Sequence, residues 1–171
     1  MFPGKQSSAP RKILLVGLLV LSFACAPDAS DRFVMVADVQ QVMTRILEPA
    51  AEQYWDAVGW IDDRDEGLTE IRPTTPEEWE AVVNAAYAVA ETGNLLMMEE
   101  RAVDQGSWIR MSEEMIEAAE RAIEAAEAQN EQAVFDMGAE LYYSCTNCHA
   151  TYAVDLLRPN VRLEESSSET P

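Results

Sequence analysis

Apolar residues recur every three or four positions in four stretches of this 171-residue chain, all between residues 32 and 154. This spacing places them on one face of an α-helix, whereas a half-buried strand would need strict alternation of apolar and polar residues. The connection between the third and fourth stretches is short, so these helices are expected to run in opposite directions. We therefore predict an all-α fold, an antiparallel four-helix bundle, which is a fold that houses cofactors between facing helices.

Local signals mark the boundaries of the predicted helices. The first helix runs from Arg32 to about Val58 and should be kinked at Pro49, because the proline ring removes a backbone donor. Thr75–Glu78 has the sequence of a capping box with proline at the first helical position, and it starts the second helix. The third helix runs from about Ser107 to Gln129. Residues 59–74 are predicted to form a solvated acidic loop. They are not expected to bind a metal, because their carboxylates lack the glycine placement and the spacing of a calcium loop.

The first 24 residues have the features of a secretory signal peptide. Three basic residues precede an apolar run of 11 residues, Ile13–Phe23, which is too short to span a bilayer. Cleavage after Ala26 fits the small-residue rule, whereas cleavage before Cys25 fits a bacterial lipoprotein signal and explains the third cysteine. We favour the lipoprotein interpretation, which predicts a periplasmic protein anchored to an envelope membrane by lipid on Cys25.

Polar segments flank the predicted bundle. Residues 25–31 are expected to be a linker, and residues 155–171 a disordered tail with too little apolar content to pack. Without the signal peptide the chain has nine arginines, no lysine and 31 acidic residues, a net charge of −22. Nucleic acid and anionic membrane surfaces are therefore poor partners. The charge fits either a solvated, solubilising surface or an acidic docking face for a basic redox partner protein of unknown identity.

The last helical stretch begins at Asn130, which is predicted to cap it, and carries Cys145, Cys148 and His149 as the motif CxxCH near its end. Residues at positions i, i+3 and i+4 leave the same face of a helix. In an exported protein this motif is typical of one covalently attached haem c. Both thiols form thioethers with the vinyl groups, and the histidine gives the iron its proximal nitrogen ligand.

Three other interpretations of the motif fit the sequence less well. Two inert, unmodified thiols would give CxxCH by chance. A thioredoxin-like redox pair lies at the start of a helix in a βαβ unit, but here no strand pattern precedes the motif. Zinc would need a fourth ligand, and the chain has no second histidine or second pair of cysteines to supply it.

The chain resembles the cytochrome c-prime family, whose members are four-helix proteins with one CxxCH close to the C-terminus. The resemblance covers roughly Asp31 to Val154 and includes the segments VQQVMTRILEPAAEQYWDAVG and TPEEWEAVVNAAYAVAETGNLLM. It implies a five-coordinate haem iron, with an apolar side chain of the first helix over the open side, where NO or CO binds. It also implies a homodimer through the first two helices. One departure is Ala153, where family members commonly carry arginine.

The distal side of the haem is predicted from the first helix. His149 is the only histidine, so the sixth position of the iron must be empty, or hold water or methionine. We expect Met43, with Val39 beside it, to face this side. Met43 either ligates the iron or fills an irregular gap in the core. Tyr152 follows His149 by three residues and is expected to pack against the haem, although an ordinary core aromatic has the same sequence pattern.

Two functions follow from these expectations. The first is an exported monohaem c-type cytochrome that transfers single electrons and can bind NO or CO at a five-coordinate iron. The alternative is a dedicated NO or CO scavenger or sensor with no role as an electron carrier. We do not expect an enzyme, because a peroxidase-like site needs a distal acid–base group, usually histidine, and the only histidine is committed to the iron.

Overall fold

The structure is a computed structural model that describes residues 33–65 and 67–154. The predicted signal peptide, the lipidated Cys25, the linker and the C-terminal tail lie outside these residues and stay predictions. Within the described part of the chain, no helix combines the length and the apolar character needed to cross a membrane.

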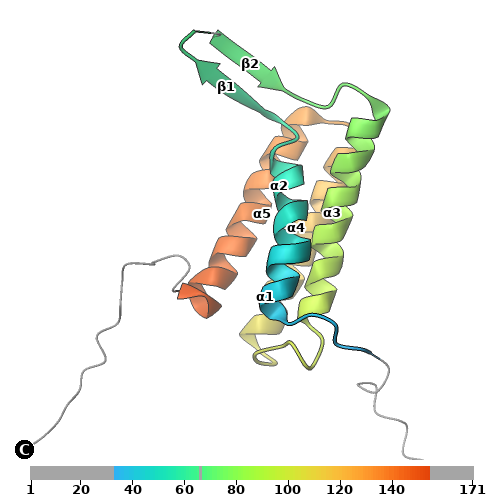
Figure 1. The fold of residues 1–171 in the computed structure, drawn as a ribbon, viewed down its shortest axis with the longest axis vertical. Coiled ribbons are helices and arrows are strands. Elements are labelled where there is room, and N and C mark those ends of the chain that lie inside the picture. Colours follow the sequence, from blue (N-terminus) through green and yellow to red (C-terminus); the bar gives the residue numbers. More distant parts are fainter. Residues whose placement is uncertain (1–32, 66, 155–171) are drawn as a thin grey trace, which may run out of the picture. The chain divides into compact units, whose positions relative to one another are not determined.

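The described residues are mostly helical, which confirms the predicted helical class (Figure 1). The first helical segment consists of three consecutive pieces, and three longer helices follow. These elements are α1 (Val39–Val42), the π-helix η2 (Met43–Leu47), α2 (Glu48–Trp55), α3 (Pro76–Leu96), α4 (Ser107–Glu127) and α5 (Glu131–Tyr152). A two-stranded antiparallel sheet, which the sequence analysis did not predict, lies between α2 and α3 and comprises β1 (Gly59–Asp63) and β2 (Gly67–Ile71).

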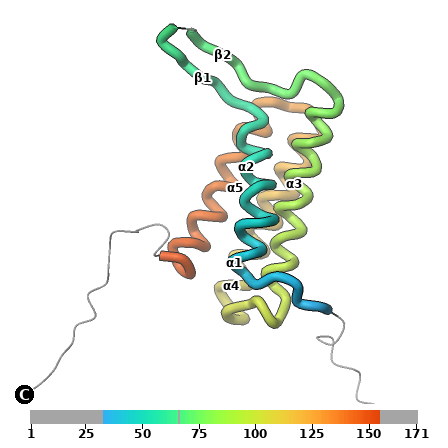
Figure 2. The backbone as a smooth tube through the Cα atoms, in the orientation of Figure 1, coloured from blue at the N-terminus to red at the C-terminus, as the bar shows by residue number. Residues whose placement is uncertain are grey.

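The helices pack side by side, and successive helices run in opposite directions (Figure 1). Helix α4 packs against both α3 and α5, while α2 packs against α3 and, less extensively, against α5. Their facing sides bury one apolar core, whose largest fully buried side chains include Tyr54, Val89 and Leu141. The end of α5, the start of α1 and the α3–α4 connection lie at the same end of the helices (Figure 2). This end carries the CxxCH motif.

The first helix begins later than predicted. Asp38 caps α1, since the backbone N–H of Gln41 donates to its carboxylate (2.8 Å) and the Gln41 side chain accepts from the Asp38 N–H (3.0 Å). This capping box fixes the helix start, so the residues before it are not helical. Val36, which lies in this non-helical segment, is 87% exposed.

A π-helical turn, and not a simple kink, precedes Pro49. The backbone N–H of Glu48 donates to the carbonyl of Met43, five residues earlier. The extra residue in this turn changes the spacing of the buried positions, so Val42 and Leu47, five residues apart, both face the core. For the same reason Ile46, four residues after Val42, is 38% exposed.

The prediction of a loop at residues 59–74 was wrong, because Gly59 pairs with Ile71 and Asp63 with Gly67 in a β-hairpin. Gly67 has a positive φ of 79°, and the Asp63 carboxylate accepts from the N–H of Asp65 (2.8 Å), which closes the turn. The hairpin is mostly exposed. Its Trp60 ring packs edge-on against Phe135 of α5, with 5.3 Å between ring centroids.

The caps of α3 and α5 are confirmed. At α3, the Thr75 hydroxyl accepts from the Glu78 N–H (3.2 Å), and the Glu78 carboxylate accepts from the Thr75 N–H (3.1 Å). At α5, the Asn130 side chain accepts from the N–H of Ala133 (3.1 Å). These bonds satisfy backbone donors that a helix start otherwise leaves without partners.

Close packing of α3 against α4 depends on Gly93. A Cβ atom at this position would collide with the side chain of Ile116 and lie 3.2 Å from the carbonyl oxygen of Ser112. We expect Gly93→Ala to lower the free energy of unfolding by about 1–3 kcal/mol through overpacking, despite the better helix propensity of alanine. Chemical denaturation measures the change. Gly59→Ala, where a Cβ meets nothing within 4 Å, is the control. Equal stability of the Gly93 variant and the wild type would contradict this account.

Candidate functional site

Helix α5 brings the three motif residues onto one face. It is continuous from Glu131 to Tyr152, so Cys145, Cys148 and His149 keep the i, i+3, i+4 relation that the sequence predicts. All three side chains are half-buried. The site is therefore partly covered by protein and partly open, as a group attached along one edge requires.

The two thiols lie in an environment that keeps them protonated. Burial raises the pKa of Cys145, and burial together with the nearby charge of Cys145 raises the pKa of Cys148. A redox-active CxxC pair needs the opposite shift, because its thiolate is the attacking form. The element before α5 is the helix α4, not a strand. Both observations disfavour the thioredoxin-like interpretation.

Among residues 33–65 and 67–154, no group of three or more histidine, cysteine, aspartate or glutamate side chains is arranged to hold a metal ion. In that region His149 is a single imidazole beside two thiols. This set fits covalent haem, where the porphyrin supplies four of the iron ligands and the protein supplies the axial ones.

Tyr152 anchors the end of α5, one turn after His149. Its hydroxyl donates to the carboxylate of Asp104, and its ring packs edge-on against Trp108 at 5.0 Å between centroids. Asp104 also accepts from the N–H groups of Gly106 (2.7 Å) and Trp108 (3.2 Å). This hydrogen bond lowers the pKa of Asp104 and raises that of Tyr152. Tyr152 thus holds the last turn of α5 against α4, while its predicted contact with haem stays a prediction.

Val39 and Met43 lie on different helical segments from the CxxCH motif. Both are half-buried and pack against the apolar core. Their segments, α1 and η2, have α3 as their main neighbouring helix, whereas the motif lies on α5, whose main neighbour is α4. The structure therefore brings Cys145, Cys148, His149 and Tyr152 together on α5, whereas Val39 and Met43 lie on the separate segments α1 and η2. Figure 2 shows α1 at the same end of the helices as the end of α5.

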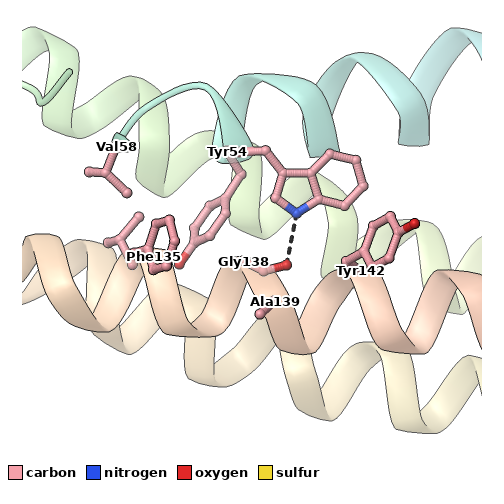
Figure 3. A pocket seen from close by; sticks show the side chains of 8 residues that line it. Tyr54, Val58, Phe135, Gly138, Ala139 and Tyr142 are labelled. Atoms are coloured by element: carbon pink, nitrogen blue, oxygen red, sulfur yellow. Dashed lines mark hydrogen bonds between the residues drawn. The ribbon is translucent and has the colours of Figure 1, made fainter. Parts of the chain in front are cut away.

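One contact between α2 and α5 was not predicted from the sequence. The indole N–H of Trp55 donates to the carbonyl oxygen of Gly138 (2.9 Å), as the dashed line in Figure 3 marks. A Cβ at Gly138 would lie 3.2 Å from Cδ1 of Trp55, so glycine permits this approach. The contact closes one side of a mostly apolar groove, which Tyr54, Phe135 and Tyr142 also line (Figure 3). The sequence signal for this contact was Gly138 itself, because a glycine inside a strongly helical segment often marks a close approach of another element.

No known protein family, curated protein or solved structure gives a significant match to this chain.

Proposed function

We propose that the chain is an exported c-type cytochrome with one haem attached to the last helix of an antiparallel four-helix bundle, similar to the cytochrome c-prime family. The observation that carries this proposal is the CxxCH motif on one face of a continuous helix, with both thiols and the imidazole half-buried. The alternation of helix direction supports the bundle assignment (Figure 1). Haem staining of a variant that carries both Cys145→Ser and Cys148→Ser tests the proposal.

Each motif residue has a distinct role in this proposal. Cys145 and Cys148 would hold the haem through two thioether bonds, each S–H adding across a vinyl group with its hydrogen going to the neighbouring carbon. The His149 imidazole would supply a nitrogen ligand to the iron. The Tyr152–Asp104 hydrogen bond restrains the helical turn after His149 and so limits the orientations that the imidazole can adopt. When bound, the haem supplies a one-electron couple and an iron site for diatomic gases.

Single-electron transfer is the function that we favour, with NO or CO binding at a five-coordinate iron. A half-buried motif keeps the attached edge close to the surface, where a partner can approach. We infer no catalytic turnover. In the described part of the chain every acidic side chain is exposed or half-buried, which supports a solvated surface over a set of acid–base groups in the core.

A dedicated gas-binding role without electron transfer is the second candidate. It is supported by the packing of Met43, which contacts the apolar core and is not freely exposed. A methionine held in this way can block the distal side without bonding to the iron.

The coordination number separates the two roles of Met43. We expect Met43→Ala to leave the resting absorption spectrum nearly unchanged, because a core-packing methionine contributes no iron ligand. The ferrous protein should bind CO before and after the substitution, with a broad high-spin Soret band that sharpens on binding. Met137→Ala is the control for packing effects, because it removes a half-buried methionine from a different helix, α5. A switch from a low-spin to a high-spin spectrum in Met43→Ala alone would instead show methionine ligation.

A further inference from the structure

Aromatic side chains gather on the part of the surface that β1, α2 and α5 share. The Trp60 ring lies edge-on to Phe135 (5.3 Å between centroids), and the Tyr142 ring lies edge-on to Trp55 (6.2 Å) and Tyr143 (6.5 Å). Trp60 is 52% exposed, Phe135 45%, Tyr142 57% and Tyr143 62%. We call these side chains, with Trp55, the aromatic face. Exposed apolar side chains that lie together, and not singly, mark interaction surfaces.

The groove between α2 and α5 joins the two groups of rings. It has a volume of about 290 Å³, and Trp55, Phe135 and Tyr142 line it (Figure 3). The Tyr54 hydroxyl and the Trp55 indole N–H, which also belong to its lining, already donate to backbone carbonyls (3.2 Å and 2.9 Å). A small-molecule site needs polar groups that fix the orientation of the ligand, whereas the core of a protein interface is rich in aromatic side chains. The groove therefore fits an apolar side chain of a protein better than a polar small molecule.

Exposed carboxylates border the aromatic face on both helices. They belong to Glu52 and Asp56 on and at the end of α2, and to Asp136 and Glu140 on α5. Each lies one or three residues from a member of the aromatic face, so it emerges beside that face. None of them forms an ion pair with a described residue, and neither α2 nor α5 contains lysine or arginine. The border of the aromatic face therefore carries negative charge that no cation neutralises within the described region.

We propose that the aromatic face docks a basic protein, whose contact surface presents an apolar side chain ringed by lysines or arginines. A second copy of this chain would bring the same carboxylates to the same border, and an anionic membrane would also add negative charge. Like charges brought together across an interface oppose association, whereas complementary charges steer it. Arg72, which reaches α5, already pairs with Glu131 (3.2 Å) and so leaves these carboxylates to a partner.

The aromatic face adjoins the CxxCH motif. Tyr142 and Cys145 are three residues apart on α5, so their side chains leave neighbouring positions of the helix surface. A partner docked on this face lies beside the group that we propose is attached to Cys145. The docking inference goes beyond the proposed function and does not depend on haem. Only its use in electron transfer rests on the proposed attachment.

The test measures the affinity of the full-length protein for a designed peptide by isothermal titration calorimetry. The probe is a synthetic amphipathic helix with leucines on one face and lysines along both flanks. It should bind, and the same peptide with glutamate in place of lysine should not. Tyr142→Ser should weaken binding about fivefold or more, because it removes an aromatic anchor at the centre of the contact. Asp136→Asn combined with Glu140→Gln should also weaken binding and make the affinity less dependent on salt.

Matched variants on other helices are the controls. Tyr87→Ser removes an exposed tyrosine of α3, and Glu113→Gln combined with Glu117→Gln removes two exposed carboxylates of α4 at the same spacing as Asp136 and Glu140. Both should bind the peptide as the wild type does. Equal losses in the α5 variants and these controls would mean unspecific attraction to an acidic protein and would overturn the proposal.

The remaining outcomes also decide. A wild type that does not bind the lysine peptide overturns the proposal, and so does a wild-type dimer, found by sedimentation, that Tyr142→Ser dissociates, because the face would then join two copies. If circular dichroism shows that Tyr142→Ser is unfolded, the Asp136 and Glu140 variant decides in its place. Peptide binding by a protein that lacks haem would refute the proposed function and leave this inference standing, whereas a haem-loaded protein that does not bind the peptide would do the reverse.

Discussion

A variant in which Cys145 and Cys148 are both replaced by serine is expected to contain no covalent haem when produced in a host competent in c-type cytochrome maturation. Serine hydroxyls do not form the thioether bonds that the proposed haem attachment requires. Haem staining of a denaturing gel should therefore fall from a clear band to background. Because the two residues are half-buried on a helix, and serine is smaller than cysteine, the polypeptide should still fold.

The control for this experiment is Asn147→Ala, which changes an exposed side chain between the two cysteines. It should keep the full haem stain, since neither thiol is altered. The single variants Cys145→Ser and Cys148→Ser should each retain at most one thioether and stain more weakly. A double variant that stains as strongly as the wild type would rule out attachment through these residues.

His149→Gly is expected to remove the nitrogen ligand of the iron and so to change the absorption spectrum of both oxidation states. No other histidine in the sequence can replace it. The glycine leaves a space one imidazole wide, so added imidazole should restore a spectrum close to that of the wild type. Glycine within a helix costs about 1 kcal/mol of stability, which the measurement must separate from ligand loss by circular dichroism. An unchanged spectrum in this variant would mean that another group ligates the iron.

Much of the fold could be predicted because the relevant signals are local. The capping box of α3 and the Asn130 cap of α5 act within a few residues of their own position, and the three-and-four periodicity indicates which face of a helix is buried. The hairpin could not be predicted from the sequence pattern, because its strands are almost wholly exposed and so show no alternation of apolar and polar residues. The π-helical turn before Pro49 could not be predicted either, because a period of 3.6 residues assumes a uniform α-helix.

Only the part of the candidate site that lies on a single helix could be predicted from the sequence. The shared face of Cys145, Cys148 and His149 follows from their spacing on α5. The positions of Val39 and Met43 relative to this face depend on how different helices pack, which periodicity does not encode.

The intact mass of the denatured, purified wild-type protein tests the central claim most directly, because only a covalent group survives denaturation. Production in a host competent in c-type cytochrome maturation should give the mass of the processed polypeptide plus one iron porphyrin, with a peptide containing Cys145 and Cys148 carrying the whole increment. A mass equal to that of the polypeptide with two free thiols would contradict the assignment of this chain as a c-type cytochrome.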